Sequence, residues 1–455
     1  MEFKDQHQST LVEKYDRPVP RYTSYPTAAQ FQDNISPNIV DSWLKSLYPE
    51  QSLSLYVHLP FCPSLCSYCG CNMRVTHSQS LMQGYLAALR DEITMVMAKL
   101  PARMAVSTLH LGGGTPTYYA AEDLSSLFKF IGQYVVFTPG AEISLEVDPR
   151  RFTRTQAAHL KKAGVNRVSL GVQDTNSHVQ KAIGRNQTLE QTVQAFQMLH
   201  DEGIEAINTD LIYGLPLQTP ESIAQTACDV ANLRPSRLAL YGYAHVPWMK
   251  RHQRLLEPHG LPDGPERMAL FMAAREVFIQ NGYIPVGIDH FALPDDPLVL
   301  AAARGELHRN FMGYTTDTAK TLLGFGVSAI SSYPQGYVQN TTSIKDYLHQ
   351  VRQKALPIWK GLQLTELDKC SAEIIEKLLC QFQVDIAEVA GMHSLQPSHI
   401  KVHTLNLHQM MSDGLVVGDT EDKIIITERG KPFARIVASC FDGYLRQSEL
   451  RHSRL

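Results

Sequence analysis

The most informative segment of this chain is Tyr56-Val-His-Leu-Pro-Phe-Cys-Pro-Ser-Leu-Cys-Ser-Tyr-Cys-Gly-Cys-Asn72. An apolar, strand-like run, Leu53–His58, leads directly into its cysteines, so they lie in a loop at a strand end. Three cysteines spaced C-x3-C-x2-C can place three thiolates around one 4Fe-4S cubane and leave the fourth iron without a protein thiolate. Such an open iron can hold a substrate, as an open position on a catalytic metal does. The segment holds four of the chain's eight cysteines, at Cys62, Cys66, Cys69 and Cys71.

A structural zinc site is the alternative use of these clustered cysteines. Cys69 and Cys71 are separated by a single residue, which does not match the paired arms of structural zinc sites, and no second pair follows downstream. Clustered cysteines in a cytosolic chain are more often metal or cluster ligands than disulfide partners. The spacing therefore favours an iron-sulfur cluster over zinc.

The composition is that of an ordinary packed protein. The 455 residues are 44% hydrophobic and 19% charged, too apolar for a disordered chain and too long for one hydrophobic core. We therefore expect a large barrel-type domain with smaller attachments. With 42 Lys and Arg against 45 Asp and Glu, the chain has no general basic field that would gather nucleic acid. The N-terminus is polar and no run of about 18 apolar residues occurs, so we expect a cytoplasmic protein without a membrane span.

Strand-like and helix-like segments alternate through the middle of the chain. In two of the strands, apolar side chains on one face alternate with polar ones on the other, which fits a parallel β/α barrel with a polar lumen. Helical periodicity at Ser80–Leu100 and Leu189–Glu202 separates the strands. Six or seven strands predict an α/β fold with a partial, open TIM-like barrel over residues 51–340. The predicted strands are Leu53–His58, Ser107–Leu111, Glu142–Val147, Arg167–Val172, Ala206–Tyr213, Leu238–Tyr243 and Tyr283–Ile288.

Two attachments flank the predicted barrel. Residues 1–50 form an arm and a helix, because prolines in Arg17–Thr27 disfavour regular helix and sheet. Residues 341–455 form a mostly helical cap whose helices precede a two-stranded ribbon, an order that resembles a winged-helix domain. Because the chain is not basic, we expect the cap to pack as a lid rather than to bind DNA. The predicted elements are helices at Ile39–Leu47, Thr365–Cys380, Pro397–Asp413 and about 430–446, and strands at Gly414–Val417 and Lys423–Thr427.

Glycine and polar residues gather where the predicted strands end. Gly112-Gly-Gly-Thr-Pro116 follows one strand, and glycines let the backbone approach a ligand closely, although a tight turn is the alternative. Glu146, Gln173 and Asp210 each stand near the C-terminal end of a separate strand, where catalysis on this fold takes place. Their carboxylates and amide suit ribose hydroxyls and an ammonium group. Ion pairs or hydrogen bonds within the lumen are the alternative role for these three.

Several motifs together resemble one family. The C-x3-C-x2-C loop after the first strand of a β/α barrel is similar to the signature of the radical S-adenosylmethionine (SAM) superfamily. The other motifs narrow the resemblance to the oxygen-independent coproporphyrinogen III oxidases, and they extend over nearly the whole chain. They are Pro20-Arg-Tyr-Thr-Ser-Tyr-Pro-Thr27, His58-Leu-Pro-Phe-Cys62, Cys69-Gly-Cys-Asn72, Gly112-Gly-Gly-Thr-Pro-Thr117, Glu146-Val-Asp-Pro149, Gly171-Val-Gln-Asp174, Asp210-Leu-Ile-Tyr-Gly-Leu-Pro216 and His308-Arg-Asn-Phe-Met-Gly-Tyr-Thr-Thr316.

The resemblance implies an enzyme with a 4Fe-4S cluster and two SAM molecules. One SAM chelates the open iron, and one electron from the cluster cleaves it to methionine and a 5′-deoxyadenosyl radical. Cys62, Cys66 and Cys69 match the cluster ligands. Cys71 matches a residue with a supporting catalytic role, the alternative being a small buried side chain. Contacts to the first SAM match Tyr56, Gly113, Glu146 and Ile330, and contacts to the second match Tyr68, Gly114, Thr115, Gln173, Arg185, Asp210 and Ala244.

The reaction that the resemblance implies is oxidative decarboxylation without oxygen. The radical removes a hydrogen atom from the β-carbon of a propionate, the substrate radical loses an electron, and carbon dioxide leaves a vinyl group. Rings A and B of coproporphyrinogen III react in this way to give protoporphyrinogen IX in haem biosynthesis. The substrate's four propionates require cations, and Arg21 and Arg309 are our candidates. We expect a monomer that takes electrons from a flavodoxin- or ferredoxin-like donor and binds neither nucleic acid nor membrane.

Two other functions are compatible with parts of the sequence. Haem-chaperone relatives share the cysteine loop and the barrel but transfer haem without decarboxylating a substrate. They lack the Cys-Gly-Cys extension at Cys69–Cys71 and the arm motif at Arg21–Pro26, both of which this chain has. A zinc-stabilised winged-helix regulator is disfavoured by the chain's charge and by the barrel. The sequence therefore favours the oxidase.

Overall fold

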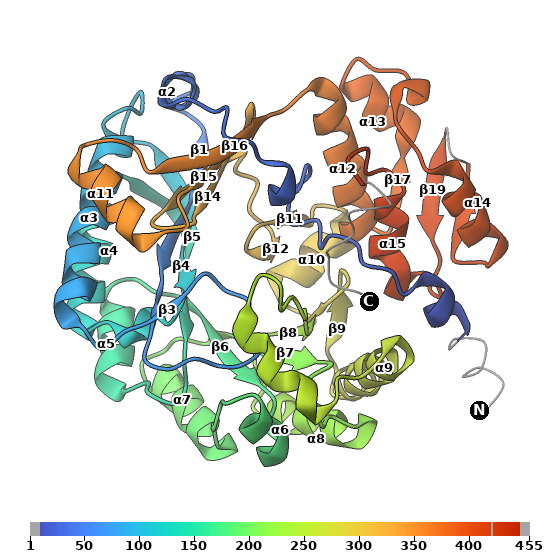
Figure 1. The fold of residues 1–455 in the computed structure, drawn as a ribbon, viewed down its shortest axis with the longest axis horizontal. Coiled ribbons are helices and arrows are strands. Elements are labelled where there is room, and N and C mark those ends of the chain that lie inside the picture. Colours follow the sequence, from blue (N-terminus) through green and yellow to red (C-terminus); the bar gives the residue numbers. More distant parts are fainter. Residues whose placement is uncertain (1–9, 420–421, 446–455) are drawn as a thin grey trace.

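The computed structural model describes residues 10–419 and 422–445. Within them, a twelve-stranded sheet curves into an open barrel, helices cover its outer face, and a smaller unit packs at one side (Figure 1). Seven adjacent strands are parallel, in the order β13-β1-β4-β5-β6-β7-β8, and the strands beyond each edge are antiparallel. The predicted α/β fold with a partial barrel is confirmed. No helix of the described residues is long and apolar enough to cross a membrane.

Six of the seven parallel strands lie close to their predicted positions. One face of each strand packs under helices and the other lines the lumen, which gives the alternating pattern. In β6 every second residue, Val168, Leu170 and Val172, is buried. The bounds are β1 Ser52–Leu59, β4 Ala105–Gly113, β5 Val136–Val147, β6 Arg167–Gln173, β7 Ala206–Tyr213 and β8 Arg237–Gly242.

The seventh parallel strand differs from the prediction. The sequence predicts it at Tyr283–Ile288, but that segment forms β9 (Ile284–Val286), which runs antiparallel to β10 (His290–Ala292) at the sheet edge. The chain reverses there because Gly287, with a φ of 59°, adopts a left-handed conformation. The seventh parallel strand is instead β13 (Thr321–Phe325), which pairs with β1. All of its residues are buried, so it shows no alternation that the sequence could reveal.

Helices between the parallel strands cover the outside of the barrel (Figure 1). Several begin at a residue whose side chain accepts a hydrogen bond from the first turn; Thr153, Thr188 and Asp263 form complete capping boxes. Their apolar stripes bury side chains such as Leu89 and Leu127 in the main core. The bounds are α3 Gln79–Met97, α4 Ala121–Ile131, α5 Arg154–Lys162, α6 Ser177–Ala182, α7 Leu189–Asp201, α8 Pro220–Ala231 and α9 Gly264–Gln280.

Antiparallel strands extend the sheet beyond β13, and one buried carboxylate ties them to the barrel. Glu92 of α3 accepts hydrogen bonds from Gly326 N (2.8 Å), Asn340 Nδ2 (2.6 Å) and Tyr347 Oη (2.6 Å). Burial raises the pKa of Glu92 to about 7. The bounds here are β14 Ile330–Tyr333, β15 Gly336–Asn340, α11 Ile344–Arg352 and β16 Ile358–Gln363.

The N-terminal arm and the C-terminal residues share one hydrophobic core. Leu11, Tyr15 and Val19 of the arm pack there together with Ile374 and Leu407. Two tyrosines then fix the arm by hydrogen bonds: Tyr22 Oη donates to Asp442 Oδ2 (2.9 Å), and Tyr25 Oη accepts from Gly443 N (2.9 Å). The shared core and these hydrogen bonds therefore attach the arm to the C-terminal unit. Shorter elements are η1 Ala28–Gln30, α2 Pro37–Lys45, β2 Phe61–Cys62, β3 Arg74–Val75, η2 Pro116–Tyr118, η3 Arg251–His259, α10 Pro297–Arg304, β11 His308–Asn310 and β12 Gly313–Thr315.

The C-terminal unit contains helices and a small antiparallel sheet, as the resemblance to a winged helix predicts, but several elements differ. The helix predicted at Pro397–Asp413 is divided into a 3₁₀ turn, Pro397–His399, and a shorter helix, Thr404–Ser412. A third strand, β17, joins the two predicted ones. The last helix, expected over about 430–446, ends at Ser439, because the chain turns there and brings Asp442 and Gly443 to the arm. The division into residues 1–50, 51–340 and 341–455 stays a prediction. The bounds are α12 Glu366–Cys380, β17 Gln383–Asp385, α13 Ile386–Met392, η4 Pro397–His399, α14 Thr404–Ser412, β18 Val416–Gly418, β19 Lys423–Ile426, η5 Lys431–Phe433 and α15 Ala434–Ser439.

Candidate active site

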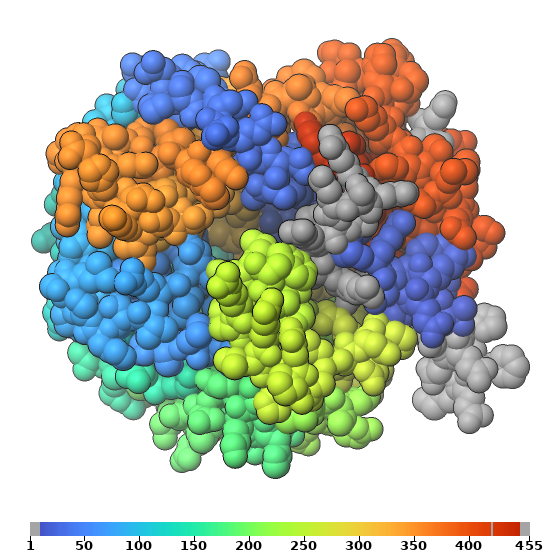
Figure 2. All heavy atoms as spheres, in the orientation of Figure 1, coloured from blue at the N-terminus to red at the C-terminus, as the bar shows by residue number. Residues whose placement is uncertain are grey.

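A cavity of about 660 Å³ lies at the carboxyl ends of the parallel strands. The cysteine loop (Cys62–Asn72), the arm and the segment after β8 border it, and Figure 2 shows the surface hollowed beside that last segment. Catalysis on β/α barrels takes place at this end of the strands, so the cavity is the candidate active site. The predicted site residues that line it are Arg21, Cys62, Cys66, Tyr68, Cys69, Cys71, Gly113, Gly114, Thr115, Glu146, Gln173, Arg185, Asp210 and Ala244.

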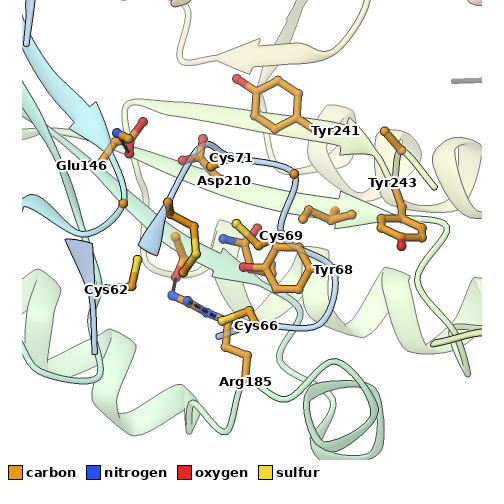
Figure 3. Close-up of a pocket in the computed structure, with 18 of the residues that line it drawn as sticks. Cys62, Cys66, Tyr68, Cys69, Cys71, Glu146, Arg185, Asp210, Tyr241 and Tyr243 are labelled. Carbon is orange, nitrogen blue, oxygen red and sulfur yellow. Dashed lines mark hydrogen bonds between the residues drawn. The ribbon is translucent and has the colours of Figure 1, made fainter. Parts of the chain in front are cut away.

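The cysteine loop brings four thiols to this cavity (Figure 3). All four are free; Cys62 and Cys66 are buried, Cys69 is half-buried and Cys71 is exposed. Burial raises the pKa of Cys62 to about 12, although Thr115 Oγ1, 3.3 Å from its sulfur, offsets part of the rise. A hydrogen bond from the Cys71 thiol lowers the pKa of Cys69 to about 7. Of the thiols whose pKa is shifted, Cys69 is therefore the one that most readily becomes a thiolate, the form that binds a metal.

Two guanidinium groups face the sulfur of Cys66. Arg185 Nη1 lies 3.8 Å and Arg150 Nη2 lies 3.9 Å from it, within hydrogen-bonding range for sulfur. Asp148 contacts both arginines, at 3.4 Å from Arg185 Nη2 and 2.6 Å from Arg150 Nη2. Burial disfavours the carboxylate of Asp148, but the two arginines outweigh burial and lower its pKa. Two cations and one anion leave a positive charge beside Cys66, which stabilises a thiolate there.

The thiols fit an iron-sulfur cluster. Among the residues that the structure describes, no three His, Cys, Asp or Glu side chains converge as the ligands of a single metal ion do. Cys62, Cys66 and Cys69 are instead spread along the cavity, as Figure 3 shows, and thiolates are the usual ligands of 4Fe-4S clusters. The arginines near Cys66 offset negative charge that thiolate ligands bring. The donor set therefore agrees with the cluster that the sequence predicts.

The glycines after β4 pack against the start of the cysteine loop. A Cβ on Gly113 would lie 2.5 Å from the ring of His58, and one on Gly114 would lie 2.7 Å from the backbone of Pro60. Gly114 N donates a hydrogen bond to Leu59 O (2.8 Å). Because no side chain fits at these positions, the end of β4 lies directly against the residues that lead into the cysteine loop, and it faces the cavity. Their contact with SAM stays a prediction.

Two carboxylates line the cavity in different surroundings. Glu146 accepts a hydrogen bond from a backbone N–H (3.0 Å), and its Oε1 lies 3.8 Å from His110 Nε2. Burial disfavours its charged form, but His110 and the backbone bond outweigh burial and lower its pKa. Asp210 accepts from Ser169 Oγ (2.7 Å) and Asn208 Nδ2 (2.9 Å), yet burial dominates and raises its pKa. Glu146 therefore holds a negative charge more readily than Asp210 does.

Gln173 ends β6 in a strained conformation. Its φ of 71° places a residue with a Cβ in the left-handed region, which costs on the order of 1–3 kcal/mol. The side chain lines the cavity. Strain of this kind collects at functional sites, so the conformation supports a ligand-binding role for Gln173.

Tyr56 and Ile330 are not among the residues that line this cavity. Tyr56 lies further along the lumen in β1, where its hydroxyl donates to His58 Nδ1 (2.9 Å) and its ring stacks on His110. It thus touches the histidine that faces Glu146. Ile330 begins β14, and its backbone closes on Gly324, where a Cβ would lie only 2.5 Å from the Ile330 carbonyl oxygen. The predicted SAM contacts of both residues stay predictions.

The two predicted substrate arginines lie in different cavities. Arg21 lines the large one, and its guanidinium donates to the carbonyl of Gly242. Arg309 lines a smaller cavity of about 140 Å³ between the arm and the barrel. Its guanidinium lies 3.7 Å from Asp289 and over the ring of Tyr314, and its Nε and Nη1 are buried without a hydrogen-bond partner. Arg21 therefore faces the candidate active site, whereas Arg309 is almost fully buried beside a different cavity.

The structure adds residues that the sequence analysis gave no role. Asp148 lies inside the motif Glu146-Val-Asp-Pro149, so that motif could have revealed it, and Arg150 follows directly. Tyr241 and Tyr243 line the cavity from the end of β8, where the position of a strand end would have pointed to them. The segment after β8 also contacts the cysteine loop through side chains, and no sequence signal connects the two.

Comparison with known proteins relates the chain to one family. The model of the radical SAM superfamily matches residues 56–229. Oxygen-independent coproporphyrinogen III oxidase from Bradyrhizobium diazoefficiens is 41% identical over 436 residues, covering 96% of this chain and 97% of the relative. The Escherichia coli protein of the same name is 42% identical over 441 residues, covering 96% and 95%.

A solved structure gives the same result for the fold. Coproporphyrinogen III oxidase from Escherichia coli, described as a radical SAM enzyme, superposes with a TM-score of 0.89 at 40% identity, covering 93% of this chain and 98% of that one. The agreement extends from the arm to the C-terminal unit rather than over the barrel alone. This chain therefore belongs to the oxygen-independent coproporphyrinogen III oxidases of the radical SAM superfamily.

Proposed function

We propose that this enzyme converts coproporphyrinogen III to protoporphyrinogen IX by oxidative decarboxylation of the propionates on rings A and B. The observation that carries the proposal is that the thiols of the cysteine loop, the glycine-rich end of β4 and the cation of Arg21 line one cavity. The family to which the chain belongs performs the oxidase reaction, and the full-length similarity favours it over the haem chaperone and the zinc-dependent regulator.

Three side chains would hold the cluster and others would hold SAM. Cys62, Cys66 and Cys69 ligate a 4Fe-4S cluster, while Arg150 and Arg185 donate toward the sulfur of Cys66. When bound, the cluster and SAM supply a carbon-centred radical that removes a hydrogen atom from the substrate. We assign Tyr56, Gly113, Glu146 and Ile330 to the SAM on the cluster, and Tyr68, Gly114, Thr115, Gln173, Arg185, Asp210 and Ala244 to a second SAM.

The charges of the cavity suit these ligands. Glu146, which keeps its negative charge, accepts a hydrogen bond from a ribose hydroxyl or the ammonium group of SAM. Burial raises the pKa of Asp210, so its carboxylate is favoured less strongly than that of Glu146. Cys71 is exposed to the cavity beside Cys69, so we propose that it supports catalysis rather than ligating iron. A single cavity bordered by the arm and the segment after β8 shields the radical from water.

The substrate's propionates need cations inside the protein. Arg21 offers one in the large cavity, and Arg309, which lines the small one, has two buried nitrogens without a hydrogen-bond partner. Charge-assisted hydrogen bonds to carboxylates orient a flexible tetra-anion firmly. We further propose that the enzyme works in the cytoplasm as a monomer and takes electrons from a flavodoxin- or ferredoxin-like donor.

An anaerobic assay tests the function. Reconstituted protein is mixed with SAM, dithionite and coproporphyrinogen III, and vinyl products and 5′-deoxyadenosine are quantified by mass spectrometry. We expect protoporphyrinogen IX with deoxyadenosine formed in step, and neither product from Cys66→Ala. Haem binding without vinyl product would instead support the chaperone, and stoichiometric zinc without either would support the regulator.

A further inference from the structure

The segment after β8 protrudes beside the mouth of the cavity, where Figure 2 shows it in yellow-green. Three of its large apolar side chains are unusually exposed: Trp248 at 46%, Leu255 at 62%, and Met249 at 70%, which also lines the cavity. Single exposed apolar residues are common, but several close together on one protruding segment are typical of an interaction surface.

The same segment is basic in a chain that is acidic overall. From Val246 to Leu256 it carries Lys250, Arg251 and Arg254 and no Asp or Glu, whereas the whole chain has a net charge of −3. Arg251 and Arg254 are exposed, and within the described part of the chain neither enters an ion pair. The next acidic residue, Glu257, faces His245 at 3.1 Å. An acidic protein surface would therefore complement this segment.

The inner side of the segment is hydrogen-bonded to the cysteine loop. Lys250 Nζ donates to Cys71 O (2.7 Å), His252 Nε2 donates to Cys69 O (2.8 Å), and Gln253 Nε2 donates to Tyr68 O (2.8 Å). Cys69 is one of the proposed cluster ligands. A single layer of side chains thus joins the exposed surface to the cluster site, and electron transfer needs such a short path.

We propose that Trp248, Arg251, Arg254 and Leu255, here named the donor face, are the docking surface for an acidic one-electron donor protein. The inference rests on the proposed function, which requires electrons from outside the chain. With a flavodoxin as donor, its anionic flavin hydroquinone gives one electron and becomes the neutral semiquinone, and the oxidised cluster gains that electron. No proton or other group moves between the two proteins.

Flavodoxin in its hydroquinone form is the probe for the test. The variant Arg251→Glu/Arg254→Glu reverses the two exposed charges and leaves the Lys250, His252 and Gln253 contacts intact. Its matched control is Lys423→Glu/Arg429→Glu, which reverses two exposed charges on the C-terminal unit. Binding to reconstituted protein is measured by calorimetry at several salt concentrations, and vinyl product is measured with flavodoxin and with dithionite.

For the Arg251/Arg254 variant we expect the dissociation constant for flavodoxin to rise about tenfold or more and its salt dependence to flatten, because charges at an interface rim govern association. The flavodoxin-driven rate falls to match, whereas the dithionite-driven rate stays within about twofold of wild type. The control variant binds flavodoxin like wild type.

Three results would contradict the proposal that the donor face binds the electron donor. The first two are unchanged flavodoxin binding by the Arg251/Arg254 variant and an equal loss of flavodoxin binding in the control variant. The third is a raised KM of the Arg251/Arg254 variant for coproporphyrinogen III with dithionite, which would mean that the two arginines attract the substrate. Failure of wild type to form vinyl product with dithionite would instead count against the proposed function itself. Binding and activity therefore distinguish the two failures.

Discussion

Two regions enclose the same cavity, and they are built differently. The wall, formed by the cysteine loop and the ends of β4 to β6, contains buried charges in contact, with Asp148 between Arg150 and Arg185. The closing region, formed by the arm, is held against the C-terminal unit by apolar packing and by two neutral hydroxyls, of which Tyr22 donates a hydrogen bond and Tyr25 accepts one. In the wall, the ion pairs of Asp148 with Arg150 and Arg185 stabilise the folded protein, and the same arginines contact Cys66 at the proposed cluster site. In the closing region the two tyrosines that fix the arm do not line the cavity, whereas Arg21 does.

The largest effect is expected when the wall loses its central anion. Asp148→Asn leaves two buried guanidinium groups without their carboxylate, and breaking a buried ion pair in this way costs roughly 3–5 kcal/mol of unfolding free energy. Denaturant unfolding of the cluster-free protein should show a lower midpoint, and iron per chain after reconstitution should fall because both arginines contact Cys66.

Asp201→Asn serves as the control for this substitution. Asp201 also pairs with an arginine, Arg154, but on the surface, where ion pairs contribute little. We expect its midpoint to match wild type. Equal midpoints for Asp148→Asn and Asp201→Asn would show that the wall does not depend on its buried charges.

A smaller effect is expected where the antiparallel strands join the wall through Glu92. Its pKa in the folded protein is raised from 4.5 to about 7, so the neutral carboxyl favours the folded state. That stabilisation is complete below pH 4.5 and is lost as the pH rises through about 7. Relative to Glu92→Gln, wild type should lose roughly 3 kcal/mol of unfolding free energy across this interval.

The measurement is the unfolding free energy of both proteins at several pH values between 4 and 8. The pH dependence is the informative quantity, because the substitution also changes the hydrogen bonds to Gly326 and Asn340. Glu190→Gln, at an exposed glutamate of α7, should reproduce the wild-type profile. Parallel profiles for wild type and Glu92→Gln would contradict the assigned titration.

The same contrast explains what the sequence could predict. The strands of the wall repeat a local pattern of one apolar and one polar face, so β1 and β4 to β8 could be located from short windows. β13 is buried throughout and pairs with a strand far away in sequence, and the turn at Gly287 redirects the segment expected in its place. A local sequence pattern predicts where a strand lies, whereas tertiary packing decides which other strand it pairs with.

The candidate site divides in a similar way. Cysteine spacing and glycines after a strand are local signals, and the residues they mark do line one cavity. The contacts of Lys250, His252 and Gln253 with the cysteine loop join segments distant in the chain, so no local pattern indicates them. Motif context selected both Arg21 and Arg309 but could not show that they lie in different cavities.

The smallest effect is expected from the two candidate substrate arginines, Arg21 in the closing region and Arg309 in β11, tested by Arg21→Met and Arg309→Met with dithionite as reductant. Arg21→Met should raise the KM for coproporphyrinogen III about tenfold with little change in unfolding midpoint, because a charge-assisted bond is lost while the tyrosines still fix the arm. Arg309→Met should raise KM only a few-fold, since Asp289 at 3.7 Å already offsets its charge, and should lower the midpoint. Arg304→Met, at an exposed arginine, should change neither. Unchanged KM in both test variants would remove Arg21 and Arg309 from the substrate site.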